Sequence, residues 1–141
     1  EVQQQSNLTF RLYDWGRVGS DGKPRQIHIA ESLACTDFSR GPVNPVTPQS
    51  THRNGVSCER LVECPYFDIH RYQSAGTMLL QHDDRFRILM VVQGSARLSC
   101  GDKQPPATLP IGTTLLVPAE SEPLEVTLTD AATLLEVSRP A

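Results

Sequence analysis

The sequence has little of what proteins that bind nucleic acid or cross membranes use. Aromatic residues make up 6% of the 141 residues, and 13 lysines and arginines against 16 aspartates and glutamates give a net charge of −3. A chain without excess positive charge offers no electrostatic basis for binding nucleic acid or an acidic membrane surface. No apolar run is long enough to span a bilayer. We therefore expect no nucleic-acid or membrane partner and a cytoplasmic location.

Several short motifs are missing as well. The four cysteines, Cys35, Cys58, Cys64 and Cys100, form no C-x-x-C pair, so their spacing predicts neither a zinc ribbon nor a redox couple. We expect them to be buried, reduced thiols. The sequence also lacks a P-loop, a Rossmann glycine cluster and a G-x-S-x-G elbow, which leaves nucleotide and serine-hydrolase functions without support.

The first third of the chain reads as an arm rather than as a compact domain. Residues 1–15 alternate in the manner of one or two strands, and GRVGSDGKPR (16–25) has the composition of a glycine-rich loop. The stretch IHIAESLACTDF (27–38) is a helix candidate of at most three turns. Three prolines in residues 39–55 predict an extended connector.

From residue 56 the pattern changes to short strands separated by turn residues. Regular spacing and the alternation of Leu124, Val126 and Leu128 with polar residues predict an antiparallel sandwich or barrel. The segment FRILMVVQGSARLSCG predicts a hairpin that turns at Gly94. The strands are expected within residues 57–64, 66–73, 77–81, 86–92, 96–100, 113–119, 124–129 and 133–138.

One stretch of this region resembles a known fold family. RFRILMVVQGSARLSCGDK and LPIGTTLLVPAE are similar in layout to the two cupin sequence motifs, over residues 76–137. The resemblance implies an all-β, cupin-like jelly roll (a double-stranded β-helix), here with one short helix and an N-terminal strand arm. The predicted parts are a strand arm and loop (1–26), a helix and connector (27–55) and a degenerate cupin-like domain (56–141).

The metal site of the cupins is largely missing from these motifs. Cupins often hold a metal through an H-x-H, a glutamate and a later histidine, since imidazoles and a carboxylate can surround a divalent ion. Here Arg87 stands at the glutamate position, and no histidine follows VPAE. We expect QHDDR (81–85) to be a solvated turn and the chain to hold no metal. A site formed by His82 with Asp83 or Asp84 is the alternative.

The N-terminal stretch resembles a second family pattern. EVQQQSNLTFRLYDWGRVGSDGKPRQIHIAESL matches the run E-[IV]-Q-Q-x-S-[DN]-x-T-[YF]-R-[LV]-Y-D-[WFY], a K-P-R loop and a short helix, all of which follow the metal-binding cupin in class I mannose-6-phosphate isomerases. One departure is Asn7, where aspartate is usual. The resemblance implies that the chain is the C-terminal part of such a zinc-dependent enzyme, cut just after its last metal ligand.

In that family an aldose phosphate and a ketose phosphate interconvert through a cis-enediol, and zinc polarises the sugar oxygens. The resemblance gives Arg11 the role of stabilising the enediolate, and it places Glu1 in the same pocket. The alternative for Arg11 is an exposed strand arginine that stacks on Tyr13 or Trp15. Lys23 and Arg25 are candidates for contacts with the substrate phosphate, or else lie in a solvated loop.

Two functions follow from these patterns. The chain is expected to be the C-terminal portion of a mannose-6-phosphate isomerase, with a sugar phosphate as partner. Zinc and its ligands would belong to the full-length enzyme, so the chain alone would be inactive. The alternative is a stand-alone degenerate cupin that acts as a non-catalytic binding or dimerisation module. Its exposed strand edges would then pair in a homodimer.

Overall fold

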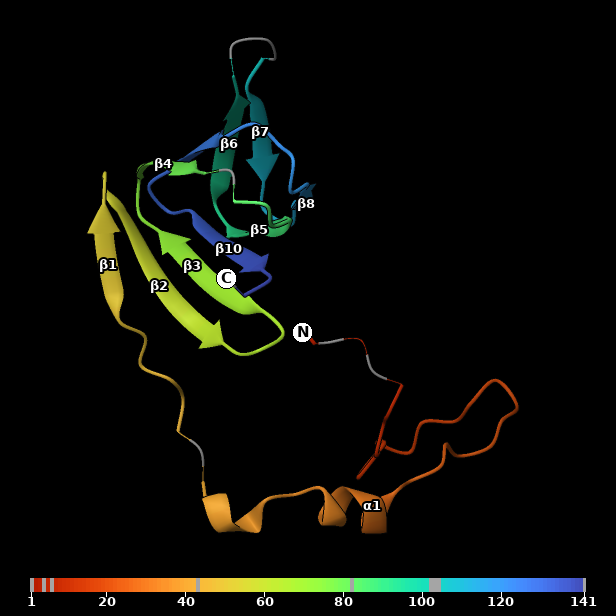
Figure 1. The fold of residues 1–141 in the computed structure, drawn as a ribbon. Coiled ribbons are helices and arrows are strands. Elements are labelled where there is room, and N and C mark those ends of the chain that lie inside the picture. The colour runs from red at the N-terminus through yellow and green to blue at the C-terminus, as the bar shows by residue number, and fades with distance from the viewer. Residues whose placement is uncertain are drawn as a thin grey trace. The chain divides into compact units, whose positions relative to one another are not determined.

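The chain divides into two compact units, residues 1–45 and residues 46–141 (Figure 1). The structure is a computed structural model that describes residues 2–3, 5, 7–42, 44–81, 83–101 and 105–140. No helix in these described ranges is long and apolar enough to cross a membrane. The second unit begins before residue 56, the predicted boundary, because it includes a strand from the predicted connector.

The first unit contains the two helical segments of the described chain. The predicted helix is confirmed within shorter bounds, as α1 (Ile29–Ala34), and a 3₁₀ helix η1 (Phe38–Arg40) follows it. Alanine, glutamate and leucine favour the helical backbone of α1, and the carboxylate of Asp37 caps η1 by accepting a hydrogen bond from Ser39 N at 3.0 Å. None of the residues of α1 is buried. The helix therefore has no face packed on a core of its own.

The strands predicted within residues 1–15 do not form in the described part of that stretch. A strand is fixed by backbone hydrogen bonds to a neighbouring strand, and alternation of side chains alone does not supply that neighbour. Instead, the segment is held at Arg11, which accepts a hydrogen bond on its carbonyl from His28 N at 2.7 Å. The described residues of the expected strand arm thus join no sheet.

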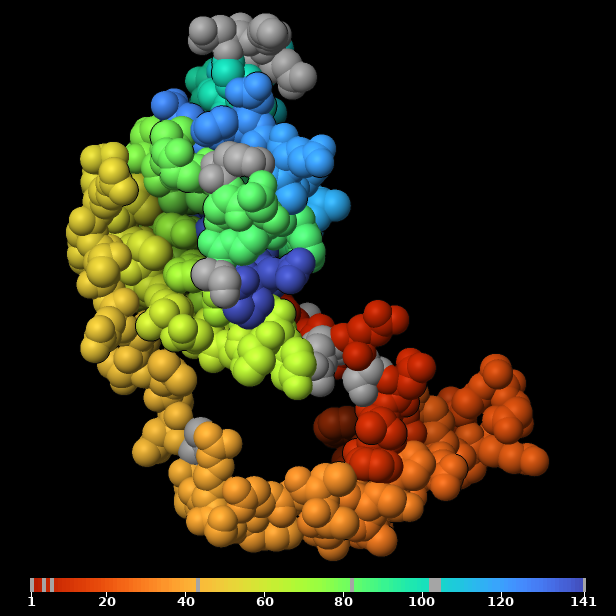
Figure 2. Space-filling view, in the orientation of Figure 1, coloured from red at the N-terminus to blue at the C-terminus, as the bar shows by residue number. Residues whose placement is uncertain are grey.

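The second unit consists of two antiparallel sheets. One has the order β1-β2-β3-β10-β5-β8, and the other has the order β4-β9-β6-β7. The strands are β1 (Ser50–Arg53), β2 (Val56–Glu63), β3 (Asp68–Gln73), β4 (Gly76–Leu80), β5 (Arg87–Gln93), β6 (Ser95–Cys100), β7 (Ala107–Pro110), β8 (Thr114–Val117), β9 (Leu124–Leu128) and β10 (Thr133–Ser138). Each of the eight predicted strands is present. Figure 2 shows the yellow residues of β1 and β2 along one flank of this unit, beside the green residues of β3 and β4.

From β3 to β6 the chain changes sheet at every step, and this corrects the hairpin predicted at Gly94. β5 pairs with β10 and β8, whereas β6 pairs with β7 and β9, so the turn at Gly94 connects the two sheets. Gly94 has φ +65°, and a Cβ there would lie 2.9 Å from the carbonyl oxygen of Ala131 and from Cα of Ala132. The turn is therefore packed directly against the β9–β10 connection.

The core lies between the two sheets. The inward residues of β5 and β10, such as Leu89, Val91 and Leu134, face those of β9, such as Val126 and Leu128. All five are at most 2% exposed. Full burial of a side chain of this size contributes about 1.5–3 kcal/mol, so the facing sheets stabilise one another through these rows.

The expectation of buried cysteines is wrong for Cys35, which is exposed in the first unit, after α1. Cys58, Cys64 and Cys100 are half-buried in the second unit. All four carry free thiols. Their positions agree with the absence of a paired cysteine motif in the sequence.

Substituting Gly94 by alanine tests the packed turn. We expect Gly94→Ala to lower the free energy of unfolding by about 1 kcal/mol, because alanine disfavours the left-handed backbone. The crowded Cβ should lower it by about 1–3 kcal/mol more. Gly101→Ala is the matched control, because Gly101 also has a positive φ, +55°, but no described atom within 4 Å of the added Cβ. Urea denaturation measures both. Equal destabilisation by the two variants would contradict the packing of the turn.

Candidate functional site

The chain reverses twice in the first unit, and the first reversal is a tight turn at Asp14–Arg17. Arg17 N donates to the carbonyl of Asp14 at 3.0 Å, and the two central residues, Trp15 and Gly16, have φ values of 51° and 67°. A positive φ at both central positions is the pattern of a type I′ turn. A positive φ is uncommon for a tryptophan. We attribute the stability of this turn to the hydrogen bonds that the Arg17 side chain donates to the Asp14 carboxylate across it.

The second reversal lies in the glycine-rich loop that the sequence predicts. Val18 and Pro24 form a β-bridge, and Gly19 N donates to the carbonyl of Lys23 at 2.8 Å. The loop closes on itself through the turn between these residues, where Gly22 N donates to the carbonyl of Gly19. Residue 25 is thereby returned to the neighbourhood of residue 14.

Three arginines meet around the carboxylate of Asp14, which is only 4% exposed. Arg25 donates to both oxygens, at 2.8 and 2.7 Å, and Arg17 donates from Nε and Nη2 to Oδ1, at 3.1 and 2.7 Å. Arg11 Nε lies 3.6 Å from the same Oδ1. We call these four residues the Asp14 cluster. Because one carboxylate meets three guanidinium groups, the cluster carries an excess positive charge and suits an anion.

The hydrogen bonds from the arginines control the ionisation of this carboxyl group. The bond from Arg25 is the largest cause, with Arg17 adding a hydrogen bond and its charge, and together they outweigh the effect of burial and lower the pKa of Asp14 from 3.8 to about 2. The same pairing raises the pKa of Arg25. Asp14 is therefore ionised at neutral pH and fixes the arginine side chains around it.

The structure places Arg11 between two segments of the first unit. Its Nη1 donates to the carbonyl of Gln26 at 3.0 Å, its backbone N donates to Nδ1 of His28 at 3.2 Å, and its side chain is 22% exposed. The predicted alternative, stacking of Arg11 on Tyr13 or Trp15, is not the arrangement found. The guanidinium over the Trp15 ring belongs to Arg17, at 5.7 Å from the ring centroid.

The four predicted site residues are only partly brought together. Arg11 and Arg25 share Asp14, whereas Lys23 lies exposed on the loop, outside the cluster. Glu1 lies outside the described residues. Asp14 and Arg17 are not among the residues predicted from the sequence. The spacing of an aspartate midway between two arginines, each three residues away, was the available signal.

The interior of the second unit contains a different polar group, in which charges are paired. Arg87 Nε lies 2.7 Å from Glu136 Oε1 without an aligned hydrogen bond, and Arg87 Nη2 donates to Asp83 Oδ2 at 2.5 Å. Tyr72 donates its hydroxyl to Glu136 Oε2 at 2.7 Å. Arg87 and Glu136 are 8% and 5% exposed. Charges at this depth require partners, because each would otherwise lose its hydration uncompensated.

The described residues do not fit a metal ion. They contain no group of three histidine, cysteine, aspartate or glutamate side chains able to surround one. Asp83 is held by Arg85 and Arg87, and although burial raises its pKa, the hydrogen bond from Arg85 and the charge of Arg87 keep that pKa below its usual value. His82 lies outside the described residues, so the alternative site built on it rests on the sequence alone. At the position of the cupin glutamate the structure has a cation, Arg87, inside an ion-paired group.

Substituting Asp14 by asparagine is expected to release Arg25 and Arg17 from the cluster. Since the folded pKa of Asp14 is lowered from 3.8 to about 2, the stabilisation by the cluster is complete above about pH 4 and is lost as the pH falls toward 2. The Nε–H resonance of Arg25 in an NMR titration should keep its paired position down to that range. In Asp14→Asn it should take the unpaired position at every pH. A resonance that shifts between pH 5 and 4 in the parent chain would contradict this assignment.

Comparisons with known proteins place these features in context. The family model "Mannose-6-phosphate isomerase, cupin domain" matches residues 57–131. The Bacillus subtilis protein YvyI, which is named as a mannose-6-phosphate isomerase, is 31% identical over 121 residues. These are 85% of this chain and 37% of that protein. The mannose-6-phosphate isomerase of Streptococcus mutans is 30% identical over 104 residues, 74% of this chain and 32% of that protein. The chain thus spans about a third of the length of the curated relatives it matches.

Solved structures agree with the sequence comparisons. The crystal structure of the mannose 6-phosphate isomerase from Bacillus subtilis matches 94% of this chain and 40% of its own, with a TM-score of 0.74 and 25% identity. KdgF from Halomonas, at 16% identity and a TM-score of 0.56, covers 68% of this chain and 87% of its own and shows the fold alone. The predicted all-β, cupin-like fold is confirmed.

Proposed function

The chain belongs to the mannose-6-phosphate isomerase family, and we propose that it is the C-terminal part of an enzyme that interconverts mannose 6-phosphate and fructose 6-phosphate. The observation that carries the proposal is the extent of the similarity. The match to YvyI over 121 residues is longer than the second unit, so it continues into the first unit, and the crystal structure of the Bacillus subtilis isomerase matches 94% of this chain. A cytoplasmic location belongs to the same proposal, since sugar phosphates are cytoplasmic metabolites.

Arg11 is the residue of this chain that we assign to the chemistry. In the isomerisation a proton moves between C1 and C2 of the sugar phosphate, and negative charge develops on the enediol oxygens in between. A guanidinium suits that charge because it stays protonated and offers several donors in one plane. Asp14, Gln26 and His28 hold Arg11 in place before any substrate arrives. An oriented cation stabilises a developing charge without first having to be ordered.

The phosphate contact is assigned to Lys23 in preference to Arg25. Arg25 donates to both oxygens of Asp14, so its guanidinium is occupied within the cluster. Lys23 is exposed on the loop, where its ammonium can reach an anion. Glu1 is assigned to the pocket by the family resemblance.

We assign the metal of the reaction to the part of the full-length relatives that lies outside the segment matched by this chain. The described residues supply no ligand set for zinc. We also propose that this other part covers the exposed apolar side chains of the first unit, such as Leu8, Leu12 and Trp15, which are 76%, 56% and 74% exposed. Apolar side chains gathered on one segment usually mark an interaction surface.

A chimera tests these assignments. It joins this chain to the part of the Bacillus subtilis isomerase outside the match, and isomerisation of mannose 6-phosphate is followed with zinc present. We expect the chimera to be active, and Arg11→Ala to lower its kcat by about 10²–10³-fold with a smaller effect on KM, as for loss of a donor to a developing oxyanion. The 141-residue chain alone with zinc should show no turnover.

Arg40→Ala is the matched control in the chimera, because Arg40 is an exposed arginine of the same unit that makes no contact with Asp14. It should leave kcat unchanged. Turnover by the chain alone, equal activity of the Arg11→Ala and parent chimeras, or a folded and zinc-loaded chimera without activity would each contradict the proposal.

One observation favours the alternative of a dimerisation module. β1 forms an edge of the six-stranded sheet, and all four of its residues are exposed. An unpaired edge strand is a template for a second chain, so two copies could pair through β1 and continue the sheet. Sedimentation velocity tests this. A purely monomeric chain at high concentration would contradict dimer formation.

A further inference from the structure

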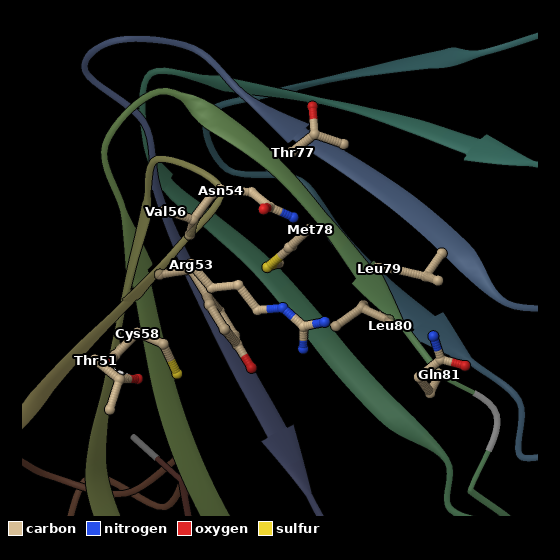
Figure 3. A pocket seen from close by; sticks show the side chains of 11 residues that line it. Thr51, Arg53, Asn54, Val56, Cys58, Thr77, Met78, Leu79, Leu80 and Gln81 are labelled. Atoms are coloured by element: carbon tan, nitrogen blue, oxygen red, sulfur yellow. Dashed lines mark hydrogen bonds between the residues drawn. The ribbon is translucent and has the colours of Figure 1, made fainter.

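A cavity of about 320 Å³ opens in the second unit between the β1–β2 hairpin and β4. This volume is at the lower end of the range of small-molecule sites. Figure 3 shows that its side chains come from both sheets, with Arg53 of β1 extending toward Leu80 of β4. The cavity belongs wholly to the second unit and contains none of the residues assigned above to the isomerase reaction.

The deep part of the cavity is apolar. Val56 and Leu80 are 3% and 8% exposed, and Met78 packs against the same core. Because side chains alternate along β4, Thr77 points away from this apolar wall. Its hydroxyl forms a hydrogen bond with the hydroxyl of Thr127 on β9, at 3.0 Å. The inner wall therefore presents few groups with which a buried hydroxyl could form a hydrogen bond.

Besides Arg53, two side chains that line the cavity can ionise, Cys58 and Tyr72, and both are neutral. Burial raises the pKa of the Cys58 thiol, and burial together with the carboxylate of Glu136 raises the pKa of Tyr72. The hydroxyl proton of Tyr72 is already donated to Glu136. Neither group brings a charge into the cavity at neutral pH.

Arg53 is a cation at the mouth of the cavity that has no ion-pair partner among the described residues. The two carboxylates on the same hairpin are engaged elsewhere. Glu59 accepts from Arg71 Nε at 2.6 Å and from Ser50 at 2.9 Å, and Glu63 pairs with Arg60 at 2.9 Å. The buried carboxylate Glu136 is paired with Arg87. The guanidinium of Arg53 is therefore available to bind a ligand. A guanidinium binds a carboxylate through two parallel hydrogen bonds.

We infer that this cavity binds a small monocarboxylate with an apolar body, its carboxylate on Arg53 and its aliphatic or aromatic part against Val56, Met78 and Leu80. One guanidinium matches a single negative charge. A sugar phosphate fits less well, because its several hydroxyls would lose water against an apolar wall without gaining partners. This ligand site is independent of the proposed isomerase reaction.

The backbone frames the mouth of the cavity tightly. Gly76, which begins β4, lies against the β1–β2 turn, and a Cβ at this position would collide with the carbonyl oxygen of Asn54 and with Val56. The hairpin that carries Arg53 is thus held against the first residue of β4. The backbone that carries Arg53 is therefore ordered before a ligand binds, which lowers the entropy cost of binding.

Methionine labelling gives a direct test, since Met78 and Met90 are the two methionines of the chain. Met90 lies on β5 and does not line the cavity. The full 141-residue chain, with ¹³C-methyl methionine, is titrated with phenylacetate. We expect the Met78 methyl signal to shift with a dissociation constant of about 1 mM, the scale for a ligand of this size, while Met90 stays unchanged.

Matched variants separate the charge from the apolar contact. Arg53→Gln should weaken phenylacetate binding at least about tenfold, as expected for a charge-assisted pair. Arg97→Gln, on the exposed face of β6, should not weaken it. Phenylacetamide, the neutral analogue, should bind the parent chain about as weakly as phenylacetate binds Arg53→Gln.

Four outcomes would overturn the inference. They are equal shifts of the two methionines, no shift of Met78 at saturating phenylacetate, unchanged binding in Arg53→Gln, and tighter binding of mannose 6-phosphate than of phenylacetate at Met78. None of them depends on isomerase activity. The inference and the proposed function therefore fail separately.

Discussion

The first unit depends on the neutralisation of one buried carboxylate. Neither α1 nor η1 buries a side chain, and apolar residues such as Leu8 and Trp15 are largely exposed, so the described residues of this unit form no hydrophobic core that could determine its shape. Asp14 is buried and ionised, which is possible only because guanidinium groups replace its lost hydration. The turn at Asp14–Arg17 and the loop that returns Arg25 both end at this carboxylate. The orientation of Arg11, and with it the assigned chemistry, follows from the same cluster.

The second unit has the opposite balance. Its stability lies in apolar rows between two sheets, and its buried charges are confined to a small paired group around Arg87 and Glu136. At the position where cupins carry a metal-binding glutamate, this chain thus has Arg87, whose guanidinium cannot coordinate a metal ion. A buried pair of this kind adds little net stability, yet removing one partner would leave the other charge exposed to an apolar interior. The second unit thus keeps the cupin fold, with its buried charges paired with one another.

Much of the fold could be predicted from the sequence, and the errors have physical causes. Alternation of apolar residues identified eight of the ten strands. The two that were missed are β1, whose four residues are all exposed, and β7, a short strand with a single buried residue, Leu109, so neither carries an alternating apolar signal. Gly94 marked a turn correctly, but local pattern does not reveal whether the strands on either side pair with each other or enter different sheets. Arg11 was found through its family motif. The spacing of Asp14 between Arg11 and Arg17 signals those two contacts, but its contact with Arg25 depends on a loop closure that spacing does not show.

The position of β10 has a consequence for the synthesis of the protein. This strand is the last in the chain, yet it lies in the middle of the large sheet, between β3 and β5. While the polypeptide leaves the ribosome, β3 and β5 therefore have no common neighbour, and each exposes a row of unpaired amide and carbonyl groups. The large sheet can close only after β10 itself has emerged, so β3 and β5 keep these open rows while all the residues between β5 and β10 are being synthesised.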